Sequence, residues 1–158
     1  MKLYHGSIVE IDTIDLSKSR PNKDFGRGFY LSADRQQAKR MGEFKALIEG
    51  GTPMMNMYEV DDNILSSADL KVLQFDGYSR KWAEFIFLNR NNSLLQSAHD
   101  YDVVYGPIAN DRVGVQISKY EAGDITLDQF LENLKYMKGI TYQYFFGTER
   151  TIAKLQKL

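Results

Sequence analysis

The chain has 158 residues, of which 43% are hydrophobic and 13% aromatic, so residues 1–158 are expected to fold as one domain rather than to be disordered. Its 20 basic and 21 acidic residues give a formal net charge of −1, and no stretch approaches the roughly 20 apolar residues that span a bilayer, so we expect a cytoplasmic protein without a membrane partner. Cysteine is absent and the only histidines are His5 and His99, which excludes disulfide scaffolds, thiolate zinc sites and cysteine nucleophiles, and we expect no metal site.

Hydrophobic periodicity divides the chain into nine elements, in which helices and strands are mixed without the strict alternation of a doubly wound sheet. The fold class is therefore expected to be α+β, with a mostly antiparallel core. In chain order the expected elements are strands over residues 3–5 and 26–31, a helix from about 33 to 49, a strand over 54–60, a helix over 79–90, a strand over 101–105, a helix from 127, a strand over 140–146 and a last short helix after 148.

Capping residues mark the starts of three of these helices. Ser32 is expected to cap the first helix, with Asp34 in its first turn. Thr126 and Gln129 form a capping box ahead of the third helix, and Thr148 precedes the last one. The apolar stripe that the first helix is expected to turn inward consists of Ala38, Met41, Phe44 and Ile48.

The first segment of chemical interest is Tyr4-His5-Gly6-Ser7 at the end of the first strand. His5 is placed beside open backbone, where its imidazole can hydrogen-bond a ribose hydroxyl, and Gly6 lets a ligand approach closely. The same residues also fit a histidine that only closes a turn.

The second segment runs from Asp24 to Ser32 and contains Gly26-Arg27-Gly28-Phe29-Tyr30. Two glycines followed by an aromatic pair suggest a backbone that bends around a flat ligand, with Tyr30 stacked on an aromatic ring. The alternative is a glycine-rich turn that enters a core strand.

The third segment is the aromatic run over residues 141–148, in which Gln143 is a polar residue among tyrosines and phenylalanines. An amide at this position can orient a hydroxyl group of a ligand. The alternative is that Gln143 lies on a solvated face of the strand.

Together the three segments resemble the ADP-ribosyltransferase superfamily, in its diphtheria-toxin-like and poly(ADP-ribose) polymerase-like branch. Members carry a histidine from the first strand, a tyrosine from a following strand and a polar or acidic residue from a late strand; His5 and Tyr30 match the first two. The chain also resembles a bacterial family of transferase-like proteins of unassigned function, which shares the Tyr-Gly-Pro-Ile-Ala-Asn-Asp-Arg-Val stretch at residues 105–113 and the late Gln-Tyr strand at 143–149.

The resemblance implies an ADP-ribosyltransferase-like fold, in which two small, mostly antiparallel sheets flanked by helices form a cleft for NAD. It implies that His5 hydrogen-bonds a ribose hydroxyl, that Tyr30 stacks on the nicotinamide, and that a nucleophile of the target captures the ribose when nicotinamide leaves. NAD is thus the expected co-substrate, and no metal is required. The residues expected to bind NAD are His5, Gly6, Ser7, Gly26, Arg27, Gly28, Tyr30 and Ser32.

The third catalytic position departs from the pattern of the superfamily. Many members place glutamate there to stabilise the developing positive charge, whereas this chain offers Gln143, which has no charge. Asp111, which is expected in a loop, is the preferred source of the missing charge, ahead of Glu149. Asp111 also fits a turn residue, and Glu149 fits an acid in the first turn of a helix.

The implied function is that of an NAD-dependent mono-ADP-ribosyltransferase, a bacterial toxin or effector with a cognate antitoxin or immunity protein. The acceptor is expected to be a protein, and nucleic acid is not excluded, although the near-neutral charge disfavours long tracts of it. Two alternatives stay open. The fold binds NAD without transfer because Gln143 is neutral, or it is a protein-interaction module whose 10 tyrosines and 9 phenylalanines build a partner surface.

Overall fold

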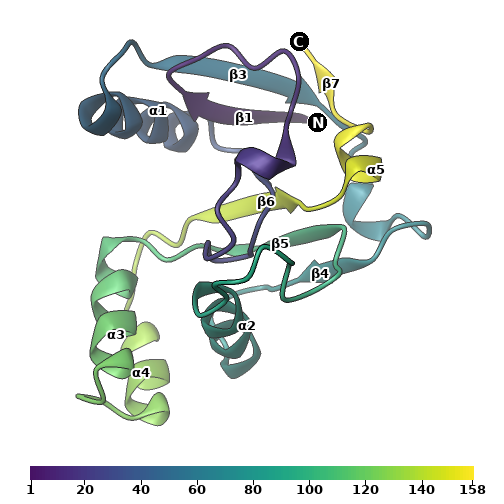
Figure 1. Cartoon of the computed structure of the whole chain (residues 1–158). Coiled ribbons are helices and arrows are strands. Elements are labelled where there is room, and N and C mark those ends of the chain that lie inside the picture. Colours follow the sequence, from purple (N-terminus) through teal and green to yellow (C-terminus); the bar gives the residue numbers. More distant parts are fainter.

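The computed structural model describes residues 1–158, and its strands form two small sheets that lie one above the other in Figure 1. The upper sheet is antiparallel with the strand order β1-β3-β7, whereas the lower sheet has the order β2-β6-β5-β4 and only its β4–β5 pair is parallel. The strands are β1 Lys2–Ser7, β2 Phe29–Leu31, β3 Met54–Glu59, β4 Val72–Gln74, β5 Val103–Pro107, β6 Tyr142–Phe146 and β7 Gln156–Lys157. The α+β class and the mostly antiparallel arrangement are confirmed.

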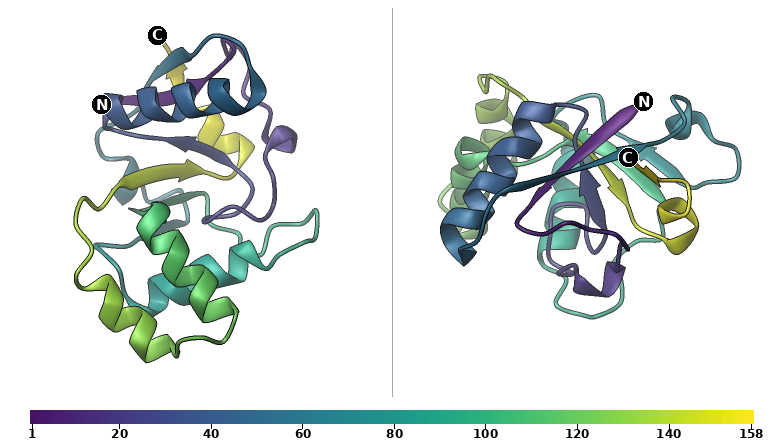
Figure 2. Two further views of the ribbon diagram at one scale, coloured as in Figure 1. Left: turned by 90° about the vertical axis from the view of Figure 1, so that its left-hand side faces the viewer. Right: turned by 90° about the horizontal axis from the view of Figure 1, so that it is seen from above.

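Five α-helices accompany the sheets, with α1 along the upper sheet and α2, α3 and α4 beneath the lower one (Figures 1 and 2). The helices are α1 Arg35–Glu49, α2 Arg80–Arg90, α3 Asp111–Glu121, α4 Leu127–Leu134 and α5 Glu149–Ile152, and Leu16–Lys18 and Ile64–Ser66 form single 3₁₀ turns. None of the helices combines the length and the apolar character that crossing a membrane requires.

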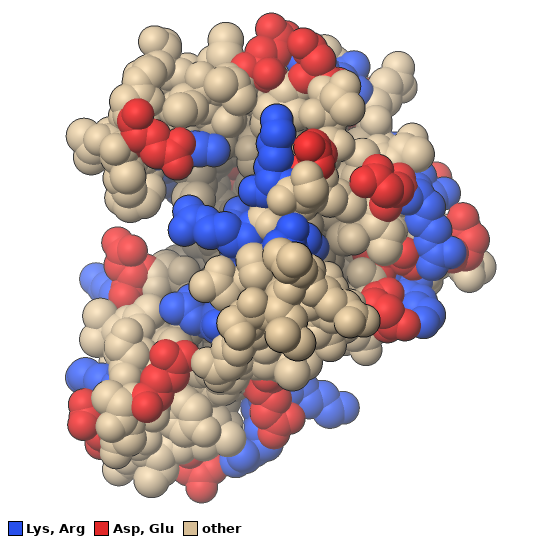
Figure 3. Space-filling view, in the orientation of Figure 1, with Lys and Arg blue, Asp and Glu red and all other residues tan.

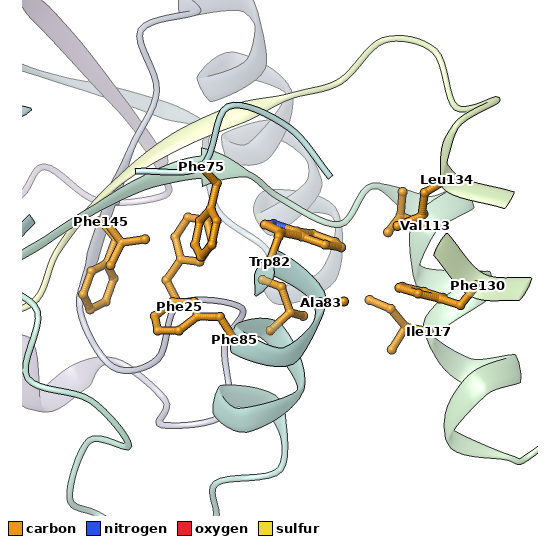
Figure 4. Packing of buried hydrophobic residues seen from close by; sticks show 12 residues of the cluster. Phe25, Phe75, Trp82, Ala83, Phe85, Val113, Ile117, Phe130, Leu134 and Phe145 are labelled. Carbon is orange, nitrogen blue, oxygen red and sulfur yellow. The ribbon is translucent and has the colours of Figure 1, made fainter. Parts of the chain in front are cut away.

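The lower sheet carries a hydrophobic core on each of its faces. Leu3 of β1 and Phe146 of β6 belong to the core between the two sheets. Phe145 of β6 belongs to the other core, where it is joined by Trp82 of α2 and Phe130 of α4 (Figure 4). Since successive side chains of a strand point to opposite faces, Gln143 lies on the same face of β6 as Phe145.

The first helix has a different cap from the one that the sequence suggested. Asp34 is the N-cap, and its Oδ1 accepts hydrogen bonds from the backbone N–H groups of Gln36 and Gln37 at 2.8 and 3.3 Å. The Ser32 hydroxyl accepts the N–H of Asp34 and donates to Gln37 Oε1 at 2.6 Å. The prediction that Ser32 caps α1 is therefore wrong, and Ser32 is instead a buried link between β2 and α1.

Small residues form the face that α1 turns toward the upper sheet, which is not the face that periodicity predicted. Ala38 and Gly42 are buried, and Gly6 of β1 approaches so closely that an added Cβ would lie 1.8 Å from the carbonyl oxygen of Ala38. Close contact between two backbones leaves no room for large side chains, so the prediction is wrong for all of the stripe except Ala38. The exposed members of the predicted stripe are Met41 at 47%, Phe44 at 59% and Ile48 at 66%.

All nine predicted elements are present, and the structure adds α3, β4 and β7. Asn110 caps α3 by accepting the N–H of Val113 at 2.9 Å, and Asp111 is the first residue of the helix, so the prediction of a loop at Asp111 is wrong. Only Val113 and Ile117 of α3 are buried. Val113, Val115 and Ile117 are spaced two residues apart, and this alternation does not have the period of a helix, so α3 could not be identified from sequence.

The predicted capping box of α4 is confirmed and can be tested by mutation. Thr126 Oγ1 accepts the N–H of Gln129 at 3.1 Å, and Gln129 Oε1 accepts the N–H of Thr126 at 2.8 Å. Thr126→Ala is expected to lower the free energy of unfolding by about 1 kcal/mol, measured by denaturant titration. The exposed Thr13 lies outside any helix, and Thr13→Ala serves as the control. Equal effects of the two substitutions would contradict a role for the cap.

Candidate functional site

A cleft of about 500 Å³ separates β1 and α1 from the loop that precedes β2. In Figure 3 the molecule is hollowed between its upper and lower halves, and Lys and Arg side chains gather beside this hollow. The 15 residues that line the cleft are Tyr4, His5, Gly6, Arg20, Asn22, Lys23, Asp24, Tyr30, Ser32, Ala38, Met41, Arg90, Ile108, Ala109 and Gln143. His5, Tyr30 and Gln143, from three different strands, therefore share one cavity.

His5 enters the cleft as a neutral imidazole with one nitrogen free to accept. Its Nδ1 lies 2.8 Å from the carbonyl oxygen of Tyr30, and because a carbonyl only accepts, Nδ1 carries the proton. The ring stacks on Phe29 with a centroid distance of 4.4 Å. Burial lowers the pKa of His5 to about 4, so at neutral pH Nε2 is an unprotonated acceptor. Such an atom suits the hydroxyl of a sugar.

The ring of Tyr30, and not its hydroxyl, is available to a ligand in the cleft. The hydroxyl donates to the carbonyl oxygen of Gly26 at 2.6 Å and accepts the N–H of Phe25 at 3.0 Å. Desolvation raises the pKa of the phenol well above its usual value, so it is no acid or base at neutral pH. The Phe25 ring lies parallel to Tyr30 at 6.1 Å, and the Lys23 ammonium lies 5.1 Å from the centroid of Tyr30. Tyr30 is thus a fixed ring that already attracts a cation.

Gln143 brings an uncharged polar group to the cleft from β6. It is only 9% exposed, so the alternative of a solvated surface residue is wrong. The amide of glutamine provides a carbonyl acceptor and an N–H donor but no charge. Gln143 can orient a hydroxyl group beside His5 and Tyr30, and it cannot serve as a base.

Cations outnumber acids in the cleft, which the sequence analysis did not foresee. Arg20, Lys23 and Arg90 face a single carboxylate, Asp24, whose Oδ1 pairs with Arg90 Nη1 at 3.0 Å and whose Oδ2 accepts the N–H of Ala109 at 3.0 Å. Desolvation lowers the pKa of Lys23, and the neighbouring cations lower it further. This excess of positive charge suits an anionic group such as a diphosphate.

Part of this basic cluster had a signal in the sequence. Residues 18–27 hold Lys18, Arg20, Lys23 and Arg27 against the single acid Asp24, in a chain that is otherwise balanced. A local excess of positive charge attracts anionic ligands. Arg90 and Ala109 reach the cleft from the ends of other elements and had no comparable signal.

Four residues that were expected to bind NAD lie outside the cleft and have structural roles. Ser7 is buried beside Gly42 of α1. Gly26 has a φ of 88° and provides the carbonyl that accepts the Tyr30 hydroxyl, while Arg27 Nη1 donates to the carbonyl oxygen of Ser17. Gly28 packs so closely on Phe145 that an added Cβ would lie 2.1 Å from its ring.

Neither acidic candidate for the third position lines the cleft. Asp111 lines a neighbouring depression that shares Arg90 and Ala109 with the cleft. Glu149 begins α5 beyond the far end of β6, next to Arg150, which pairs with the buried Asp102. No group of three or more His, Asp or Glu side chains is arranged to hold a metal ion. The cleft therefore presents one imidazole, two tyrosine rings, two side-chain amides, one carboxylate and several cations.

Comparisons with known proteins identify a family but no activity. A family model described as "Protein of unknown function (DUF3990)" matches residues 1–157. No curated protein and no solved structure matches the chain. The chemistry of the cleft is therefore the guide to its function.

Proposed function

We propose that this chain, which belongs to the family described as "Protein of unknown function (DUF3990)", is an NAD-dependent mono-ADP-ribosyltransferase with an ADP-ribosyltransferase-like fold. The observation that carries the proposal is the convergence of His5, Tyr30 and Gln143 in one cleft of about 500 Å³. That volume lies within the range of small-molecule and cofactor sites. The acceptor is a macromolecule, and the proposal includes a toxin or effector role with a neutralising partner protein.

The nicotinamide, its ribose and the diphosphate of NAD each have a complementary group in the cleft. His5 Nε2 accepts a hydrogen bond from a ribose hydroxyl, since burial keeps this nitrogen unprotonated. The ring of Tyr30, which now lies near the Lys23 ammonium, takes the cationic pyridinium of nicotinamide. Arg20 and Arg90 balance the negative charge of the diphosphate. The cleft thus holds the two ends of the scissile bond in a fixed orientation, which is the main contribution expected of it.

The reaction needs no acid to expel the leaving group. The bond between ribose C1′ and the nicotinamide nitrogen breaks, and its electron pair stays on that nitrogen and neutralises the pyridinium. The ribose becomes an oxocarbenium-like cation, and a nucleophile of the acceptor forms the new bond to C1′ and loses its proton to water. Gln143 orients the ribose through its amide but provides no negative charge for the transition state, so a slow enzyme is expected.

Labelled NAD tests this proposal directly. The purified protein is incubated with ³²P-labelled NAD and a cell lysate, and label in macromolecules is compared with that left by the His5→Ala, Tyr30→Ala double variant. Wild type is expected to transfer label and release free nicotinamide. The proposal fails if the double variant, shown to be folded by circular dichroism, transfers as much label as wild type.

A second candidate function is NAD binding without transfer, and the neutral Gln143 favours it. It predicts a thermal shift with NAD but no nicotinamide release. A ligand at about 100 times its dissociation constant stabilises the folded state by roughly 2.7 kcal/mol, which a melting scan detects. A plain protein-interaction module would instead give no shift with NAD, and the exposed Met41, Phe44 and Ile48 of α1 would then be its contact surface.

The position of Lys23 leads to a prediction about affinity. Its ammonium must leave the face of Tyr30 before a pyridinium can stack there, and exposed cation–π contacts contribute about 0.5–1 kcal/mol. Lys23→Met is therefore expected to tighten NAD binding about two- to fivefold, measured by isothermal titration calorimetry. Lys18→Met, at the end of the preceding 3₁₀ turn and outside the cleft, is the control. Weaker binding by Lys23→Met would contradict this role and indicate that the ammonium pairs with the diphosphate.

A further inference from the structure

A second cavity of about 410 Å³ shares no lining residue with the cleft and lies on the opposite face of β6. Tyr142 and Tyr144 line it on either side of Gln143 in the sequence, and Tyr105 joins them from β5. The Tyr105 ring stacks on Tyr142 with centroids 5.4 Å apart and lies 4.6 Å from Tyr144 at a tilt of 47°, and we call this cluster of three rings the tyrosine platform. One hydrogen bond links the linings of the two cavities: the hydroxyl of Ser32, which lines the cleft, donates to Oε1 of Gln37, which lines the second cavity.

Two polar side chains of α1 line the same cavity and have hydrogen-bonding groups without a partner. Gln37 is 5% exposed and lines the cavity, and its Nε2 has no hydrogen-bond partner. A buried donor without a partner is costly, so it calls for a ligand atom that accepts. Arg40 also lines the cavity and takes part in none of the ion pairs of the chain. Asp34, the one acid nearby, is engaged as the N-cap of α1.

We propose that the second cavity binds a nucleotide, independently of the activity assigned to the cleft. The base stacks on the tyrosine platform, since every base has a π-face and aromatic side chains accept it without sequence preference. A carbonyl oxygen or ring nitrogen of the base accepts the N–H of Gln37, and the phosphate pairs with Arg40, whose guanidinium matches phosphate geometry. The volume suits one mononucleotide. The nucleotide is either free or the end of a single strand.

Calorimetric titration with uridine 5′-monophosphate and with an oligothymidylate of five nucleotides tests the proposal. The two probes distinguish a free nucleotide from the end of a single strand. Wild type is expected to bind one molecule of at least one probe. The exposed Arg40 can be changed without touching the core, and Arg40→Ala is expected to weaken binding about fivefold. Tyr144→Leu is expected to weaken it by at least as much, whereas Arg35→Ala, which removes an exposed cation of the same helix outside the cavity, leaves it unchanged.

The background variant His5→Ala distinguishes this site from the NAD cleft. The affinity of His5→Ala for the probe that wild type binds is expected to equal that of wild type. If His5→Ala loses this binding, the nucleotide lies in the cleft and the proposal is overturned. Absence of heat with both probes at about 10 mM, or equal affinities of wild type and Arg40→Ala, would overturn it as well. Tighter binding of the oligonucleotide assigns the site to nucleic acid, and tighter binding of the monophosphate assigns it to free nucleotide. Failure of the NAD activity alone would leave these affinities intact.

Discussion

Replacing His5 by phenylalanine is expected to lower the rate of nicotinamide release about 100-fold, the size of loss that misplacement of a substrate in an active site causes. A phenyl ring keeps the stacking on Phe29, where the imidazole lies at 4.4 Å, but has no nitrogen to accept a ribose hydroxyl. The measurement is chromatographic detection of nicotinamide from purified protein and NAD. Circular dichroism shows whether the variant is folded, and a folded variant with the rate of wild type would contradict the role of His5.

The pH dependence of the wild-type rate provides an independent check on His5. Its pKa is lowered from 6.5 to about 4 by burial, so Nε2 remains an acceptor and the rate is expected to be flat from about pH 8 to 5.5. The rate should fall as the pH approaches 4 and Nε2 gains a proton. The unfolded chain binds that proton first, so the stability contribution of neutral His5 is also lost as the pH falls from 6.5 to 4. Circular dichroism at each pH separates the two effects, and a rate midpoint near 6.5 would contradict a neutral, buried imidazole.

Local patterns in the sequence predicted the three side chains that meet in the cleft. His5 directly precedes Gly6, Tyr30 follows Gly28 by two residues, and Gln143 is the one amide in an aromatic strand. Such positions combine a fixed backbone with a polar or aromatic side chain, and those properties depend on a few neighbouring residues. Their convergence, by contrast, depends on how β1, β2 and β6 pair, and only the resemblance to a known superfamily suggested it.

The roles of the glycines and of the first helix could not be predicted from local patterns. Gly6 permits α1 to approach β1, and Gly28 makes room for the Phe145 ring, so both act through partners that are remote in the chain. The same close approach selects Ala38 and Gly42 for the buried face of α1, which leaves its large apolar residues exposed. Periodicity identifies a helix, but it identifies the buried face only where large side chains fill the contact.

The Gln143→Glu substitution is expected to raise the rate of nicotinamide release about tenfold or more. Two unit charges 4 Å apart attract by about 4 kcal/mol at an effective dielectric constant of 20, and even a third of that energy in the transition state corresponds to tenfold. A carboxylate at position 143 would face the positive charge that develops on the ribose, whereas the present amide does not. The desolvation cost of a buried carboxylate at position 143 is offset by the nearby cations of the cleft, which are Arg20, Lys23 and Arg90.

The matched comparison is with the two acids that the sequence offered for this position. Asp111→Asn and Glu149→Gln are expected to leave the rate unchanged, because one residue begins α3 and the other begins α5, and neither lines the cleft. Gln143→Leu, which keeps the size but removes the amide, is expected to lower the rate. If Asp111→Asn abolishes nicotinamide release while Gln143→Glu has no effect, the charge comes from α3 after the cleft closes on NAD, and Gln143 is only part of its wall. If Gln143→Glu raises the rate while Asp111→Asn and Glu149→Gln leave it unchanged, the neutral glutamine limits catalysis. The slow turnover of wild type then follows from the missing charge at position 143.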